Sequence, residues 1–146
     1  GTAGQAEVIG AIVAAGIPVM GHVGLRPQAV HQLGGYRMQR DTEQLLADAR
    51  AAAAAGACAV VLECIPAETA REVTSAVGIP TIGIGAGPHC DGQVLVMHDL
   101  VGLSFDRVPR FVRGYADVKA AIAAALAGWR ADVGSRAFPG PAETLG

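Results

Sequence analysis

The sequence predicts an α/β protein with a parallel sheet. Short apolar runs alternate along the chain with segments whose apolar residues recur at helical spacing. Two of these runs open alike: GIPVMG starts at Gly16 and GIPTIG at Gly78, 62 residues apart, which is the length of two βα units. Buried strands that alternate with helices are typical of parallel sheets. Four such strands could form a small open sheet or half of an eight-stranded barrel, and periodicity does not choose between them.

Prolines, glycines and capping residues mark the boundaries of the elements. Pro18 lacks the amide proton that a strand ladder needs, so it marks the entrance of a strand. Gly16 and Gly78 are suited to end helices, and Asp41 or Thr42 to begin one. In chain order we expect a helix within residues 1–15, a strand after Pro18 that ends at His22, a loop over 26–40, a helix over 41–56, a strand over 57–62, a helix over 67–77, a strand over 78–85, a short strand over 93–96 and a C-terminal helix over 114–135.

The composition favours one folded domain with partly covered surfaces. The chain has 146 residues, of which 51% are hydrophobic and 16% charged, and its formal net charge is −2. The length predicts that residues 1–146 form a single domain. A charged share below the ~25% usual for soluble domains indicates surfaces buried against a partner or further chain. The near-neutral charge leaves no basic patch for nucleic acid. The longest apolar run, residues 51–62, is too short to span a bilayer.

The N-terminus and the cysteines favour a cytoplasmic protein. The opening sequence GTAGQAEVIG lacks an initiator Met and the features of a signal peptide, so we expect a chain cut from within a longer one. The three cysteines are odd in number and show no CxxC spacing, which indicates free thiols in a reducing compartment.

Two side chains at predicted strand ends are the main catalytic candidates. Glu63 follows the apolar run AVVL, at the strand end where α/β folds carry their reactive groups, and a partly desolvated carboxylate suits a general base. The alternative is a glutamate that pairs with an Arg or Lys. His22 lies between two glycines at the end of the preceding strand and could donate to a substrate carbonyl or carboxylate. The alternative is a histidine that bonds only to the backbone.

Two further motifs favour local structure over ligand binding. The GIGAG sequence of residues 83–87 fits neither a dinucleotide fingerprint nor a phosphate loop, so its glycines are better suited to close passage of a ligand or a neighbouring strand. His89, Cys90 and Asp91 are adjacent but lack the paired spacings of a zinc site, and we expect a turn there.

A series of motifs resembles the ketopantoate hydroxymethyltransferase family, in order from about Gly16 to Pro139. They are GHVGLRPQ at 21–28, LGGYR at 33–37, VLECIP at 61–66, IPTIGIGAG at 79–87, DGQVLV at 91–96, PRFVR at 109–113 and Phe138-Pro139. Arg26 is a departure, since the family more often has Thr at that place. Each motif is weak alone, and together they are specific.

The resemblance implies a (β/α)8 TIM barrel, of which this chain supplies about the last four βα units, the C-terminal half, plus a C-terminal helix. The family transfers a hydroxymethyl group from 5,10-methylenetetrahydrofolate to 3-methyl-2-oxobutanoate, giving 2-dehydropantoate for pantothenate and coenzyme A biosynthesis. Glu63 lies in the motif that supplies the base forming the enolate, and the motif of His22 lies at the same barrel mouth, close to the substrate. The family is cytoplasmic and homo-oligomeric, typically a decamer.

The same resemblance implies that part of the site is absent from this sequence. The magnesium ligands of the family, and a lysine and a glutamate near the keto acid, lie on the first four strands, so we expect the base in this chain and no metal ligands. The chain alone is then expected to be inactive. Two alternatives stay open: a non-catalytic half-barrel that only assembles with a homologous barrel, and another barrel enzyme that forms an enolate from a 2-oxo acid.

Overall fold

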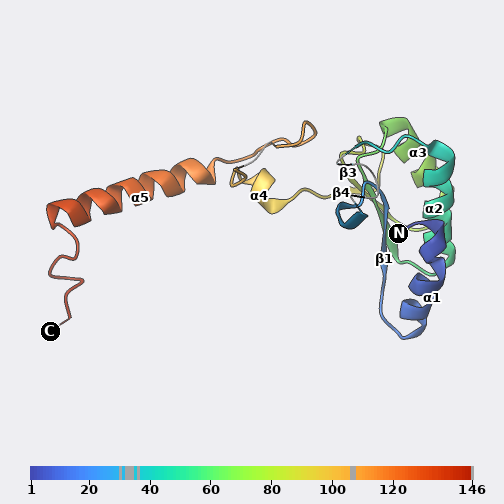
Figure 1. The fold of residues 1–146 in the computed structure, drawn as a ribbon, viewed down its shortest axis with the longest axis horizontal. Helices are drawn as coiled ribbons and strands as arrows, with labels where there is room; N and C mark the ends of the chain where they lie inside the picture. The colour runs from blue at the N-terminus through green and yellow to red at the C-terminus, as the bar shows by residue number, and fades with distance from the viewer. Residues whose placement is uncertain (30, 32–34, 36, 106–107, 146) are drawn as a thin grey trace. The chain divides into compact units, whose positions relative to one another are not determined.

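Four parallel strands form one sheet in the order β1-β2-β3-β4, as the sequence predicts. The computed structural model describes residues 1–29, 31, 35, 37–105 and 108–145 (Figure 1). The strands are β1 (Met20–Gly24), β2 (Ala59–Glu63), β3 (Thr81–Ile84) and β4 (Gly92–Gln93). Gly24 is in register with Glu63, and Glu63 with Ile84, so the carboxyl ends of the first three strands meet at one edge of the sheet.

Three helices accompany this sheet: α1 (Ala6–Ala14), α2 (Thr42–Ala54) and α3 (Ala67–Ala76). The short 3-10 turns η1 (Ala3–Gln5) and η2 (Pro27–Ala29) precede α1 and follow β1. The Asp41 carboxylate caps α2 by accepting a hydrogen bond from the Gln44 amide, as predicted. Gly78 does not cap α3, because the chain leaves that helix through Val77 in an extended conformation.

The two faces of the sheet differ in burial. Figure 1 shows α2 and α3 on one side of the strands, and there Val23, Val60 and Leu62 join a core with residues of both helices. The opposite side, called here the open face, carries Met20, His22, Val61, Glu63, Ile82 and Ile84, which are half-buried or exposed. Alternate residues along a strand point to opposite faces, which places these two sets of side chains on opposite sides of the sheet.

The last strand is shorter than predicted. Only Gly92 and Gln93 pair with β3, whereas a strand over 93–96 was expected. The amide of Val94 still donates to the Gly83 carbonyl oxygen, but β3 turns away at Gly85, whose φ is +62°, so no partner backbone remains for the residues that follow. The chain forms a short helix instead, α4 (Met97–Leu100), which the sequence analysis did not predict.

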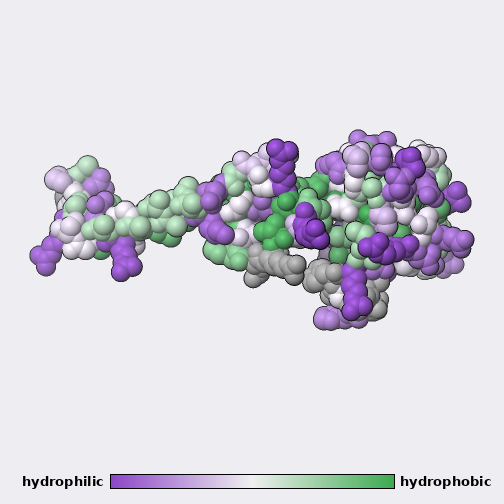
Figure 2. All heavy atoms as spheres, turned by 90° about the horizontal axis from the view of Figure 1, so that it is seen from above, coloured by the Kyte–Doolittle hydropathy of each residue, from purple (hydrophilic) through white to green (hydrophobic). Residues whose placement is uncertain are grey.

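The chain divides into two compact units, Gly1–Val94 and Leu95–Gly146. The second contains α4 and α5 (Val118–Ser135), which begins four residues later than expected and is capped by Asp117. None of the described residues of α5 is buried. In Figure 2 pale green, the colour of weakly hydrophobic residues, runs along much of this alanine-rich helix. Among the described residues, no helix combines the length and hydropathy needed to cross a membrane.

Candidate active site

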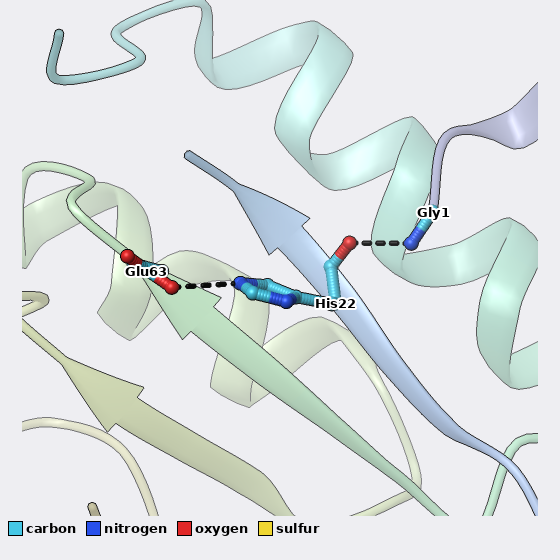
Figure 3. Close-up of polar contacts among 3 residues, drawn as sticks. All are labelled: Gly1, His22 and Glu63. Atoms are coloured by element: carbon cyan, nitrogen blue, oxygen red, sulfur yellow. Dashed lines mark hydrogen bonds and ion pairs between the residues drawn. The ribbon is translucent and has the colours of Figure 1, made fainter. Parts of the chain in front are cut away.

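His22 and Glu63 face each other across neighbouring strands of the open face (Figure 3). His22 is in register with Val61, so Glu63 stands two residues further along the adjacent strand on the same face. Nε2 of His22 lies 3.0 Å from Oε2 of Glu63, and the two side chains are 29% and 17% exposed. Sequence separation alone, 41 residues, gave no sign of this direct contact.

The geometry specifies how the pair is bonded. An ionised carboxylate only accepts hydrogen bonds, so Nε2 of His22 donates when Glu63 is ionised. The backbone carbonyl oxygen of His22 accepts a hydrogen bond from the backbone nitrogen of Gly1, and the ring makes a separate contact with Glu63 (Figure 3). Among the described residues, Glu63 therefore pairs with a histidine and not with an Arg or Lys. The His22 ring bonds to a side chain and not only to the backbone.

The position of His22 corrects one expectation. His22 is the third residue of β1, not its last, since the ladder to β2 continues to Gly24. The strand is longer because Gly24 still pairs with Glu63 and because the Leu25 amide then donates to the Glu63 carbonyl oxygen, 2.9 Å away. His22 consequently lies one layer deeper in the sheet than Glu63.

A cavity of about 380 Å³ adjoins the pair on the side of His22. Its lining includes His22, Arg26 and Gln28, together with Gly1, Gln5 and Ala29. Arg26 supplies a guanidinium, which pairs with carboxylates in a bidentate manner. The sequence analysis noted Arg26 only as a departure from the family pattern, and its place beside His22 could not be read from spacing.

The thiol next to the candidate base is neutral at neutral pH. Burial raises the pKa of the Cys64 thiol, and the negative charge of Glu63 raises it further. Because the thiolate is the reactive form of cysteine, Cys64 is a poor nucleophile where it stands.

Two glycines of the GIGAG motif lie where an added Cβ would meet close neighbours, and at Gly87 that neighbour is the start of α3 and not a strand. A Cβ at Gly87, whose φ is +76°, would lie 2.5 Å from the Cβ of Ala67, and one at Gly83 would lie 2.9 Å from Sγ of Cys90. The next motif makes a structural contact that the sequence did not reveal: Oδ2 of Asp91 accepts hydrogen bonds from the amide and the hydroxyl of Thr81.

No magnesium site forms among the described residues. Magnesium prefers several oxygen ligands, usually from carboxylates, phosphates and water. Glu63 is the only carboxylate that the described strands carry on the open face. No group of three His, Cys, Asp or Glu side chains in the described ranges is arranged to hold a metal ion.

Comparison with known proteins identifies the family of the chain. The sequence model of one family, described as ketopantoate hydroxymethyltransferase, matches residues 1–141. The chain belongs to the ketopantoate hydroxymethyltransferase family. The family accounts for the parallel sheet with helices on one face, which is part of a (β/α)8 barrel, and for the open face, which in a closed barrel points inward. Residues 33, 34 and 36 of the LGGYR motif lie outside the described residues.

Three curated relatives, each named 3-methyl-2-oxobutanoate hydroxymethyltransferase, illustrate the match. The protein of Anaeromyxobacter dehalogenans is 57% identical over 143 residues, which are 95% of this chain and 47% of the relative. That of Rhodopirellula baltica is 54% identical over 145 residues, 99% of this chain and 54% of the relative. That of Moorella thermoacetica is 56% identical over 143 residues, 93% of this chain and 53% of the relative. The chain spans about half the length of the curated relatives that it matches.

Proposed function

We propose that this chain supplies the base-bearing half of an enzyme that transfers a hydroxymethyl group to 3-methyl-2-oxobutanoate. The donor is 5,10-methylenetetrahydrofolate and the product is 2-dehydropantoate, a precursor of pantothenate and coenzyme A. Family membership and the names of the relatives support a one-carbon transfer. The observation that carries the proposal for this chain is Glu63: a half-buried carboxylate at the carboxyl end of β2, on the open face and 3.0 Å from His22.

Glu63 acts as the general base. Its carboxylate removes the proton on C3 of the keto acid, and the electron pair of that C–H bond forms the enolate. The enolate carbon then bonds to the methylene carbon of the folate, both C–N bonds of that carbon break in turn, and water supplies the hydroxyl oxygen. The two folate nitrogens take up the proton from C3 and one proton from water. Glu63 is 17% exposed, so it is shielded from bulk water yet still reachable by a substrate on the open face.

His22 holds the base in place. Its Nε2–H donates to Oε2 of Glu63, which restricts the carboxylate to one orientation and leaves Oε1 for the substrate proton. His22 also lines the cavity with Arg26, so the keto acid would bind next to it. In this arrangement His22 is close to the substrate but acts mainly through Glu63.

The remaining components lie outside what this chain can supply. The donor set for Mg²⁺ is expected on the first four strands of the barrel, and the steps assigned above involve only residues of this chain. Low charge and the open face support assembly with further polypeptide. For the complete protein we expect a homo-oligomer in the cytoplasm, a decamer as is typical of the family.

The test is proton removal by a protein that contains both halves of the barrel. Deuterium exchange at C3 of 3-methyl-2-oxobutanoate is followed by NMR in D₂O with Mg²⁺ and without folate. We expect Glu63→Gln to slow exchange by about 10²–10⁴-fold, the usual contribution of a positioned base, while the keto acid still binds. Glu68→Gln is the matched control, because that carboxylate is exposed on α3 and paired with Arg71.

Three outcomes would overturn parts of the proposal. Near-normal exchange in Glu63→Gln would remove Glu63 from the role of base. Product formation that does not require folate would indicate another enolate-forming enzyme. Stable association of this chain with a first-half polypeptide that restores no exchange would favour a half-barrel that only assembles.

A further inference from the structure

The residue after the candidate base has an unusual backbone conformation. Cys64 has a φ of +49°, and the only other non-glycine residue with positive φ in the described part of the chain is Arg136, at the end of α5. Residues with a Cβ rarely adopt this left-handed conformation, because the Cβ crowds the backbone. A cysteine has none of the local hydrogen bonding that lets Asn or Asp tolerate it.

Three backbone hydrogen bonds hold this conformation. The carbonyl oxygen of Glu63 accepts from the Leu25 amide at 2.9 Å. The amide of Cys64 donates to the Ile84 carbonyl oxygen at 3.0 Å, and its carbonyl oxygen accepts from the Gln39 amide at 3.1 Å. The peptide groups on both sides of the Cys64 Cα are thus bonded, by segments that follow β1, end β3 and precede α2.

A glycine on the neighbouring strand makes the first of these bonds possible. Gly24 is in register with Glu63 and has a φ of +93°. A Cβ at Gly24 would lie 2.2 Å from the Glu63 carbonyl oxygen, so any other residue would push β2 away. The peptide group between Glu63 and Cys64 thus has a residue with positive φ on two sides. Gly24 lies next to it on the neighbouring strand, and Cys64 follows it along the chain.

We propose that Cys64 is a positioning residue, whose left-handed backbone turns the chain after Glu63 and so directs the Glu63 carboxylate toward His22. With an extended residue at 64, the chain would continue as a strand and these bonds to Ile84 and Gln39 would not form together. The function of Cys64 lies in its backbone, and its neutral thiol is dispensable. The catalytic meaning rests on the proposed role of Glu63 as base, whereas the geometry can be tested by itself.

The experiment compares substitutions at residue 64. A role of the Cys64 backbone and a role of its side-chain packing predict opposite orders for how well these variants keep the contact between His22 and Glu63. Glycine and asparagine adopt the left-handed conformation readily, and β-branched valine resists it. If the backbone matters, Cys64→Gly and Cys64→Asn preserve the contact and Cys64→Val disrupts it. If side-chain packing matters, Cys64→Val is tolerated best and Cys64→Gly worst. Cys58→Val is the matched control, since Cys58 is exposed and lies outside the turn.

The readout is the ¹⁵N spectrum of the His22 imidazole, which reports the hydrogen bond at Nε2. The chain has four histidines, so a His22→Asn variant assigns the signal, and Glu63→Gln defines the spectrum when the ionic partner is lost. We expect Cys64→Gly and Cys64→Asn to resemble the unsubstituted chain, and Cys64→Val to resemble Glu63→Gln. A Cys64→Gly spectrum like that of Glu63→Gln, or a Cys64→Val spectrum like that of the unsubstituted chain, would overturn the proposal.

Should Cys64→Val fail to fold, Cys64→Ala takes its place. Alanine keeps more of the side chain than glycine but disfavours positive φ, so a folded Cys64→Gly that departs further from the unsubstituted spectrum than Cys64→Ala also overturns the proposal. The readout is independent of turnover. If Glu63→Gln exchanges deuterium normally, the proposed function fails while the positioning of the Glu63 carboxylate by Cys64 is still decided by the spectra.

Discussion

The two units of the chain make different use of similar apolar sequence. In Gly1–Val94, residues such as Val60 and Leu62 are fully buried between the sheet and its helices. In Leu95–Gly146, apolar residues of α5 recur at spacings of four, three and four, yet all of them are about half exposed: Ile122, Leu126, Trp129 and Val133. The comparison teaches that helical periodicity indicates which side of an element is apolar, whereas burial depends on the surface against which that side packs.

The site belongs entirely to the well-packed unit. Val23 and Leu62 are buried on the helix side of β1 and β2, and their neighbours His22 and Glu63 point to the open face. The core therefore holds the two strands from the helix side and sets the separation between the two candidate side chains. The contact between Nε2 of His22 and Oε2 of Glu63, 3.0 Å, therefore depends on the packing of the core.

The largest expected difference between the units comes from truncating one leucine in each. Leu62 is 0% exposed in the core and Leu126 is 59% exposed on α5. We expect Leu62→Ala to lower the free energy of unfolding by about 2–5 kcal/mol, as a buried cavity does. Leu126→Ala should change it by about 0.5 kcal/mol or less. Urea unfolding, combined with hydrogen exchange of the β2 and α5 amides, measures each region separately.

Equal losses of unfolding free energy in the two variants would contradict this difference between the two units. They would mean that α5 packs in solution as tightly as β2 does, so that its apolar side chains are covered. A loss of unfolding free energy in Leu62→Ala alone would support the difference between the units, because the same chemical change would then have effects that depend on burial.

A second pair of variants tests how adding a side chain at a glycine affects stability in each unit. Gly24→Ala forces a side chain into a positive-φ site and toward the Glu63 carbonyl oxygen, so we expect a loss of roughly 1–3 kcal/mol from the backbone conformation and further loss from the displaced strand. A Cβ at Gly128, in α5, meets nothing within 4 Å. Gly128→Ala should therefore stabilise α5 by about 0.5–1 kcal/mol. Thermal unfolding by circular dichroism gives the sign of each change.

Gly10 supplies a control within the first unit. It lies in α1, and an added Cβ would meet only the Ala55 carbonyl oxygen at an ordinary 3.9 Å. Gly10→Ala should be neutral or stabilising. A strong loss there would show that the whole unit resists added volume, in which case the effect of Gly24→Ala would not be specific to its place beside Glu63.

Much of this architecture could be predicted because local chemistry specifies it. Asp41 caps a helix, and the apolar run before Glu63 is short and continuous, as buried parallel strands are. The third strand was expected over residues 78–85 and begins only at Thr81, after Pro80. Glu63 and His22 were identified as candidates from their flanking residues. That the two touch depends on the register between β1 and β2, a long-range property that spacing along the chain does not encode.

What was missed depends on tertiary contacts. The end of β4 is set by the turn of its neighbour β3 at Gly85, and α4 then forms where no ladder can continue. The conformation of Cys64 is imposed by bonds from Leu25, Ile84 and Gln39, since cysteine carries no intrinsic preference for it. In each case the local sequence permits more than one conformation, and a distant segment selects among them.

The smallest expected effect concerns the border of the first unit and depends on pH. Asp91 directly precedes β4, and the Thr81 amide and hydroxyl, both donating to Oδ2, hold the pKa of this carboxyl below its usual range. Because the pKa is lower in the folded state, the ionised carboxylate stabilises folding above about pH 4, the unfolded value, and this stabilisation is lost as the pH falls through the folded value. We expect Asp91→Asn to be less stable than the unsubstituted chain at pH 7, with the difference fading in acid.

Urea midpoints from pH 7 down to pH 2.5 measure this difference, and a Thr81→Val background provides the control. Thr81→Val removes the hydroxyl donor but keeps the amide, so the pH-dependent penalty of Asp91→Asn should shrink without vanishing. A penalty that is constant across the pH range would contradict the assignment, because it would arise from geometry and not from the charge of Asp91. A penalty that follows the pH would mean that the charged Asp91 side chain helps to hold the two-residue strand Gly92–Gln93 in the sheet. Neither residue of this strand belongs to the buried core.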